Sequence, residues 1–340
     1  MNNLDYIYAV SRIRVKEKSL LTDADIQAMT AMDTEQDVME YLKARGWGGE
    51  SADASAEEML AAEERRMMDV ILDLGLDQET LDILSYPRLF HNLKTGIQEI
   101  TTSESHVKAF YDMPDFDREK VENILKKHDF DELPEMMRDV AQRALEVMLK
   151  TRDGQIVDTM VDRVCMESMT ESAEHAHNRL LRRYIELTNA LTDIRIAVRG
   201  RKMKKPRDYF ENALAATELL DVKQLADAAS APEKVPGEGE NVSAAADNAD
   251  DPLYRYLKRA GFEKAVEALK ESPASFERWC DDELIDLIRP MRTVNESVGP
   301  VLAYYLAREN EIKTVRIILT AKANDFPEEV IAERARKMYV

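Results

Sequence analysis

Apolar residues recur every three or four positions along most of this chain, as they do on one face of an α-helix. No segment keeps the alternation of apolar and polar residues that marks a half-buried strand. Turn residues are scarce, because the chain has only 11 Gly and 11 Pro among 340 residues, about half of their ordinary usage. The pattern and the composition together predict an all-α protein.

Local signals divide this pattern into separate helices. Capping residues at Thr22 and Ser55 predict helices that start directly after them, and Gly46 predicts the end of a helix that begins near Thr34. Pro87 predicts the start of a short helix, since proline is tolerated in the first helical turn and disrupts a helix interior. Further helices are expected over residues 4–20, 117–127 and 134–150.

The strongest periodicity follows Gly154. Six apolar or aromatic residues there are spaced alternately four and three apart, which forms a heptad seam: Leu180, Tyr184, Leu187, Leu191, Ile194 and Val198. Short seams of this kind are typical of helix packing inside a bundle. A seam in the same register returns near the C-terminus as Val301, Tyr305, Ile312, Val315 and Leu319, and Arg308 interrupts it.

The two seams belong to an internal repeat. A shift of 121 residues lays Tyr184–Lys202 on Tyr305–Ala323. Identical residues then pair as Tyr184 with Tyr305, Asn189 with Asn310, Arg195 with Arg316, and Ile196 with Ile317. The shared register predicts that the two tyrosines serve helix packing. We expect Arg195 and Arg316 to bridge helices through carboxylates rather than to contact a partner.

A period near 121 residues is too long for a solenoid and suggests duplicated helical domains. We expect three similar helical bundles over residues 1–112, 113–229 and 252–340, with the helix near Tyr8 as a degenerate third copy. Residues 230–251 are rich in Ala, Pro and Gly and carry six acidic residues against Lys234. This composition predicts a flexible tether, whether it has a role or is a mobile surface insertion.

Charge and chemistry exclude several classes of protein. The formal net charge of −19 argues against a nucleic-acid binder. The longest uncharged stretch, 297–307, is too short to span a bilayer, and the first residues lack the features of a secretory signal. Two cysteines suit a reducing cytoplasm. We find no catalytic, cofactor-binding or metal-ligating motif, so we expect no cofactor and no enzyme.

One segment opposes the acidic average. Residues 195–207 carry seven basic residues and no acid: Arg195, Arg199, Arg201, Lys202, Lys204, Lys205 and Arg207. One interpretation is the end of a helix, where Lys and Arg complement the helix dipole. The other is a contact surface for an anionic partner, for which an acidic protein is favoured because no aromatic residues are interleaved for base stacking. The candidate contacts are Arg199, Arg201, Lys202, Lys204 and Lys205.

Three segments resemble the C subunit of V-type (A/V-type) ATP synthases, whose counterpart in the vacuolar ATPase is the d subunit. They are the C-terminal run Ala303–Leu319 with Phe326–Ile331, the opening helix from Tyr6 to Leu21, and Leu191–Arg195 in the middle. The resemblance therefore spans essentially the whole chain. The acidic segment 230–251 is a departure from the family pattern.

The resemblance implies three similar helical domains arranged as a funnel. It further implies a rotor part without a catalytic site, which joins the D and F subunits of the central shaft to the membrane proteolipid ring at the cytoplasmic face. ATP hydrolysis or synthesis would thereby be linked to H⁺ or Na⁺ transport. The alternative from the residues alone is a helical scaffold or adaptor outside a rotary ATPase, since a fold does not fix a function.

Overall fold

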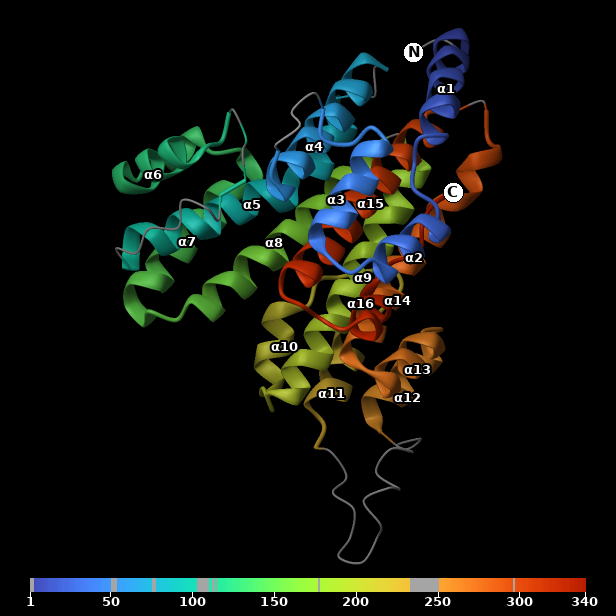
Figure 1. The fold of residues 1–340 in the computed structure, drawn as a ribbon. Coiled ribbons are helices and arrows are strands. Elements are labelled where there is room, and N and C mark those ends of the chain that lie inside the picture. The colour runs from blue at the N-terminus through green and yellow to red at the C-terminus, as the bar shows by residue number, and fades with distance from the viewer. Residues whose placement is uncertain are drawn as a thin grey trace, which may run out of the picture. The chain divides into compact units, whose positions relative to one another are not determined.

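The computed structural model describes residues 3–49, 54–74, 78–102, 110–111, 113, 115–176, 178–232, 251–295 and 297–340. Every regular element in these ranges is helical, which confirms the all-α prediction (Figure 1). The helices are α1 (Asn3–Glu17), α2 (Asp23–Ala31), α3 (Glu35–Ala44), α4 (Ala56–Asp73), α5 (Gln78–Thr102), α6 (Arg118–Lys127), α7 (Glu135–Thr151), α8 (Gly154–His175), α9 (Arg179–Lys202), α10 (Arg207–Ala213), α11 (Val222–Ser230), α12 (Pro252–Arg259), α13 (Glu263–Glu271), α14 (Pro273–Ile288), α15 (Gly299–Ala323) and α16 (Glu328–Arg334). Two 3₁₀ turns, η2 (Phe130–Glu132) and η4 (Arg289–Thr293), join them.

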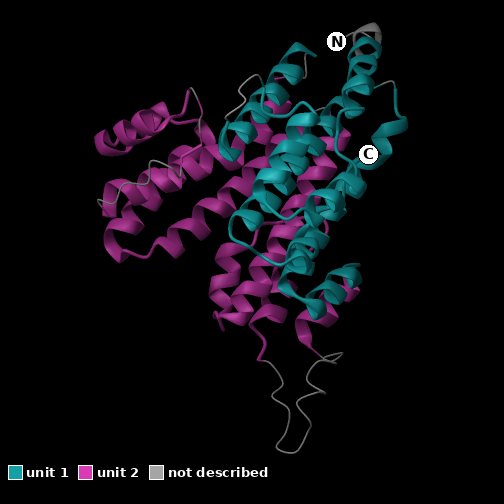
Figure 2. Cartoon of the chain, in the orientation of Figure 1, with its two compact units in different colours: residues 1–77, 261–340 teal, residues 78–260 magenta. Residues whose placement is uncertain are grey.

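The chain folds into two compact units (Figure 2). Unit 1 comprises residues 1–77 and 261–340, so both ends of the chain build one unit. Its long helix α15 packs against α1, α3, α4 and α14. Unit 2 comprises residues 78–260, and in it α8 packs against α5, α7, α9 and α10. The three-domain division and the funnel arrangement remain predictions. Most of the segment 230–251 lies outside the described residues.

Helix starts follow the local signals. Thr22 and Ser55 each form a capping box, in which the side chain accepts the N–H of the third helical residue and that residue's carboxylate accepts the N–H of the cap. Gly46 follows α3 with φ of +84°, a left-handed conformation that glycine adopts without steric cost. The predictions for these three helices are confirmed.

The prediction at Pro87 is wrong. The helix α5 runs without a break from Gln78 to Thr102 and contains Pro87 in its interior. Proline has no N–H to donate to the carbonyl one turn earlier, so this position costs the helix a hydrogen bond. The turns before Pro87 nevertheless bury Leu81 and Ile83, and α5 packs along α7 and α8. This packing stabilises the helix across the proline.

The two halves of the sequence repeat have the same local structure. The helices α9 and α15 end at Lys202 and Ala323, which are 121 residues apart. In the turns that follow, Lys204 and Asp325 each have φ of +54°. Each turn leads into a helix of seven residues, α10 in unit 2 and α16 in unit 1. The structural repeat thus extends beyond the segment that the sequence comparison aligned.

The same hydrogen bond closes both turns. The N–H of Lys205 donates to the carbonyl of Gly200 at 2.9 Å, and the N–H of Phe326 donates to the carbonyl of Ala321 at 3.0 Å. Such bonds satisfy carbonyls at the end of a helix that would otherwise lack a partner. The expected third copy, α1 followed by α2, has no residue with positive φ between its helices.

The seams differ in how deeply they are buried. On α9, Leu180, Leu191 and Ile194 are buried, whereas Tyr184, Leu187 and Val198 are half-buried. On α15, every seam residue from Val301 to Leu319 is buried. The second copy therefore lies deeper inside its unit than the first copy does.

Candidate functional site

The basic segment 195–207 covers the end of α9, the turn after it and the start of α10. Its basic residues differ in their exposure and in their contacts. Arg201 is nearly buried, with 9% of its side chain exposed, and pairs with Asp251 at 2.6 Å. Its other terminal nitrogen donates to the carbonyl of Ala228 at 2.9 Å. Because Asp251 also caps the start of α12, Arg201 connects α9 to α11 and α12 inside unit 2.

The remaining basic residues of the turn lie at the surface. Lys202 and Lys204 are exposed and form no ion pair with the described residues, and Met203 between them is 50% exposed. The ammonium of Lys205 donates to Gln155 at 2.6 Å and lies 5.2 Å from the ring centre of Tyr209. Lys202 and Lys204 are therefore accessible to another molecule, whereas Lys205 is half-buried.

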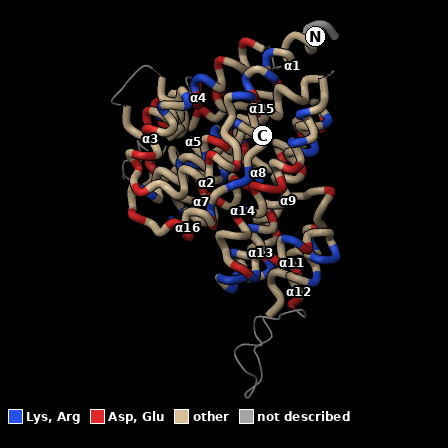
Figure 3. Tube along the Cα trace, turned by 45° about the vertical axis from the view of Figure 1, so that its right-hand side comes forward, with Lys and Arg blue, Asp and Glu red and all other residues tan. Residues whose placement is uncertain are grey.

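Two more arginines of the segment, Arg199 and Arg207, are exposed. Arg199 is exposed on α9, and Arg207 pairs with Asp227 at 2.6 Å. Elsewhere, Lys and Arg positions are interspersed with Asp and Glu along most of the trace (Figure 3). No acidic residue lies within 195–207, so the basic side chains of the turn 202–205 are not compensated by their neighbours in sequence.

The matched residues of the repeat differ in exposure, and Arg316 is exposed. Arg316 of α15 pairs with Glu64 of α4 at 3.1 Å. Tyr305 is buried, and its hydroxyl donates to Glu309 at 2.9 Å. Tyr184 and Arg195 are both half-buried on α9. The surroundings of all four residues agree with a role in helix packing, and that role remains a prediction.

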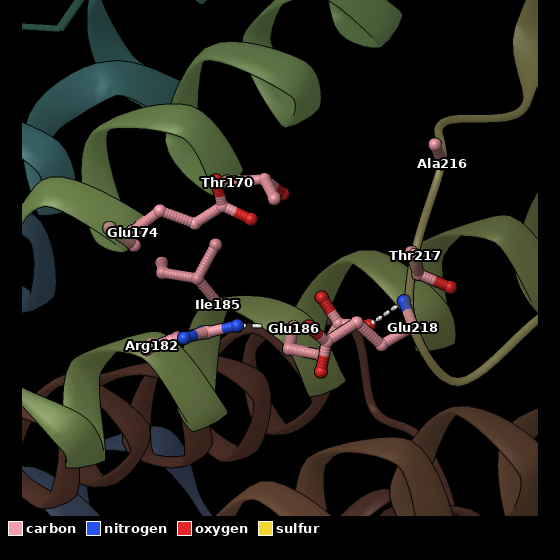
Figure 4. Close-up of a pocket in the computed structure, with 9 residues that line it drawn as sticks. Thr170, Glu174, Arg182, Ile185, Glu186, Ala216, Thr217 and Glu218 are labelled. Atoms are coloured by element: carbon pink, nitrogen blue, oxygen red, sulfur yellow. Dashed lines mark hydrogen bonds and ion pairs between the residues drawn. The ribbon is translucent and has the colours of Figure 1, made fainter.

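A cavity of about 250 Å³ lies between α8, α9 and the chain before α11 (Figure 4). A carboxylate oxygen of Glu186 accepts the N–H of Leu219 at 3.1 Å and also the N–H of Glu218. Arg182 in turn pairs with Glu218 at 2.9 Å. The charged side chains of this cavity thus hold the neighbouring loop against α9.

A larger groove of about 710 Å³ is lined by α7, α8 and α10. Three apolar residues of α8, each four positions from the next, contribute to it: Ile156, Met160 and Val164. Its charged lining is balanced, with Arg143, Arg163 and Lys205 against Asp153, Glu167 and Asp208. The groove therefore shows no preference for a partner of either charge.

Unit 1 contains a buried ionic cluster that the sequence pattern does not predict. Arg308 of α15 donates to both Glu63 of α4 and Glu311 of α15, and all three side chains are at most 7% exposed. The guanidinium of Arg308 lies 4.5 Å from the ring centre of Trp47. Burial raises the pKa of Glu311 to about 7, although Arg308 opposes the shift. The signal in the sequence was the charge that interrupts an otherwise apolar seam.

The cysteines and histidines are possible metal ligands and nucleophiles. Both Cys165 and Cys280 are buried, and burial raises the pKa of the Cys165 thiol to about 12, which leaves it unreactive at neutral pH. Within the described ranges no group of three or more His, Cys, Asp or Glu side chains is placed to hold a metal ion. Two of the five histidines, at 106 and 177, lie outside these ranges.

Length and apolar character together decide whether a helix can span a bilayer. None of the described helices is both long enough and apolar enough to cross a membrane.

Comparison with known proteins assigns the chain to a class. The sequence model of the ATP synthase (C/AC39) subunit family matches residues 9–334, so the chain belongs to this family. Members of the family are accessory rather than catalytic parts of V/A-type rotary ATPases. The chain is also similar to the C subunit of the V-type sodium ATPase of Enterococcus hirae, with 20% identity over 331 residues, which cover 96% of this chain and 97% of that protein.

Proposed function

We propose that this chain is the rotor part that couples the central shaft of a V/A-type ATPase to the membrane proteolipid ring. In this role it links ATP hydrolysis or synthesis to ion transport without a catalytic site of its own. The observation that carries the proposal is the family match over residues 9–334. The transported ion is H⁺ or Na⁺, and the name of the Enterococcus hirae relative favours Na⁺ as the first ion to test.

A coupling part has to resist shear between two dissimilar surfaces. Close-packed helices do so, because native cores have the density of organic crystals and deform little. Long helices with deeply buried faces support this role, and α15 is 25 residues long with its whole seam buried. The proposed partners are the D and F subunits of the shaft on one side and the ring on the other, at the cytoplasmic face of the membrane.

The exposed turn 202–205 is our candidate for a partner contact. Lys202 and Lys204 are exposed without ion pairs to the described residues, and Arg199 is exposed one turn before them. Their charge is opposite to the net charge of −19, so they suit an acidic patch on a protein partner. Arg201 does not contact the partner in this proposal, because its guanidinium is buried in the pair with Asp251, which holds the helix end that carries the turn.

The test is a titration of the full chain against the purified D–F pair at low and at high salt. We expect one-to-one binding that weakens at high salt, because screening shortens the range of surface charges. Binding at neither salt, followed by no binding to the detergent-solubilised ring, would overturn the proposal in favour of a helical adaptor outside a rotary ATPase.

A pair of double variants tests the turn. Lys202→Glu with Lys204→Glu reverses two charges in the turn, while Lys127→Glu with Lys264→Glu reverses two exposed lysines elsewhere. Both variants change the net charge equally. We expect only the first to lose affinity for the shaft or the ring, and equal losses in both would refute a specific contact.

A further inference from the structure

The role proposed above does not use the ionic cluster in the core of unit 1. There, Arg308 lies between two carboxylates, donating Nη1 to Glu311 and Nη2 to Glu63. The exposed fractions of the side chains are 7% for Arg308, 2% for Glu311 and 0% for Glu63. One buried cation therefore serves two buried anions, and burial in a region of low dielectric constant disfavours the ionised form of a carboxylate that has to share its cation.

The two carboxylates are not equivalent. The Oε1 atom of Glu63 accepts the N–H of Gly48 at 3.1 Å and pairs with Arg66 at 2.9 Å, and the side chain of Arg66 is 47% exposed. Glu63 thus has a second cation at the rim of the cluster. The carboxylate of Glu311 accepts hydrogen bonds from the guanidinium of Arg308 and from the backbone N–H of Leu21. No second cation among the described residues pairs with Glu311.

The remaining charged groups around the cluster have partners of their own. On α2, Asp25 accepts from Arg45 at 2.9 Å and from the hydroxyl of Tyr41 at 2.7 Å. On α15 itself, Tyr304 is buried one turn before Arg308. None of these groups offers Glu311 a further positive charge.

Carboxylates of α14 and α1, which also pack on α15, have cations of their own. In α14, Asp281 pairs at 2.8 Å with both Lys313 and Arg336. In α1, Glu17 pairs with Arg14 at 2.8 Å. Neither carboxylate therefore shares its cation with Glu311.

We propose that Glu311 is a proton-binding site, at which a proton from solvent neutralises the carboxylate that Arg308 shares with Glu63. In the ionised state Arg308 bridges both carboxylates. In the protonated state its charge is matched by Glu63 alone. Because Glu63 belongs to α4 and Leu21 lies between α1 and α2, the proton adjusts how firmly these N-terminal elements are held on α15. The inference does not depend on the proposed function.

The direction of the pH effect follows from linkage. The pKa of Glu311 is raised from 4.5 to about 7 in the folded chain. Between these values the folded chain keeps a proton that the unfolded chain has lost. The stabilising contribution of the proton is therefore complete below pH 4.5 and is lost as the pH rises through about 7.

Glu311→Gln, which imitates the protonated state, is the direct test. Denaturant unfolding of the full chain is measured from pH 4.5 to pH 8. Between pH 4.5 and about pH 7, we expect the unfolding equilibrium constant of the native sequence to rise relative to that of the variant by up to tenfold for each unit of increase in pH, as the loss of one proton requires. The same pH profile in both chains would overturn the proposal.

A second readout follows Trp47, whose ring lies against Arg308. Trp279→Phe leaves Trp47 as the single tryptophan, so its fluorescence reports the cluster in the folded state. We expect a titration with a midpoint near pH 7 that disappears on adding Glu311→Gln. If the titration survives in Glu311→Gln and disappears in Glu63→Gln, the proton belongs to Glu63 and the assignment is wrong.

Matched controls separate the cluster from other groups. Glu64→Gln removes a surface pair between the same two helices, α4 and α15, and should leave the titration of Trp47 unchanged. Asp193→Asn removes a buried carboxyl of unit 2 whose pKa is raised by burial to about 8, and it too should leave the titration of Trp47 unchanged.

Should Glu311→Gln not fold, the infrared carbonyl band of a protonated carboxyl in Asp193→Asn provides the test. Its loss around pH 7 supports the proposal, and a pH-independent spectrum refutes it.

Discussion

The helix pairs α9–α10 and α15–α16 are nearly equal in length and share their turn, but their cores are built differently. At the same repeat position α9 has the half-buried Leu187, whereas α15 has the buried Arg308. Three positions further on, the first copy has the buried Ala190 and the second has the buried Glu311. The comparison teaches that the seam and the turn determine the backbone, while the neighbouring helices decide which side chains it can bury.

A second difference is a compensating change in size. In the first copy, a Cβ added to Gly200 would lie 2.5 Å from Cε1 of Phe210. The equivalent residues of the second copy, Ala321 and Ile331, are both buried in one core cluster. The smaller Ile331 leaves room for the methyl group of Ala321. The two copies thus bury a similar volume with opposite choices of residue at the helix and at its partner.

Arg308→Leu gives the second copy the residue of the first and is expected to have the largest effect. It leaves Glu63 and Glu311 buried without their shared cation, so the free energy of unfolding at pH 7 should fall by about 3–5 kcal/mol. Denaturant unfolding measures this change. Adding Glu311→Ala, the residue of the first copy, should restore part of the loss. A stability unchanged by Arg308→Leu would contradict the buried cluster.

Local features of the fold were predictable from the sequence. The capping boxes at Thr22 and Ser55 depend on residues three positions apart, and the sequence identified both. The cluster could not be found this way, because Arg308 and Glu63 are 245 residues apart. The prediction at Pro87 failed for the same physical reason, since packing against α7 and α8 outweighs the local preference.

The candidate interface was predictable only in part. The count of basic residues identified the segment, but it could not separate Arg201 from Lys202. That distinction depends on Asp251, which lies 50 residues from Arg201 in sequence and pairs with it in the interior. Sequence composition therefore indicates where charge accumulates, and the tertiary fold decides which of those charges are exposed.

Leu191→Ala and Ile312→Ala compare the two seams at equivalent positions. Both side chains are buried, with 0% and 4% exposed, so each truncation should lower the free energy of unfolding by about 2–5 kcal/mol. We expect each variant to lose free energy of unfolding while its folded state keeps its affinity for the shaft. Thermal unfolding and the titration against the D–F pair measure the two effects separately. Unchanged thermal stability in both variants would refute the structural role of the seams.

Gly200→Ala tests the compensation of size in the first copy. The added methyl group overlaps the ring of Phe210, and such overpacking should cost about 1–3 kcal/mol. Denaturant unfolding measures the loss. Phe210→Ile in the same chain reproduces the residues of the second copy, and we expect it to remove most of the added cost. A double-mutant cycle that shows no coupling between the two positions would argue against the compensation.

Lys204→Gly and Asp325→Gly test the feature that the copies share most closely. Both residues have φ of +54°, a conformation that glycine adopts more readily than other residues, so each change should raise the free energy of unfolding by up to about 1 kcal/mol. The larger freedom of glycine in the unfolded chain opposes this gain, equally in both copies. Equal gains in denaturant unfolding would mean that the turn is the same strained element in two different cores. A gain in one copy alone would show that the surrounding helices, rather than the turn itself, fix its conformation there.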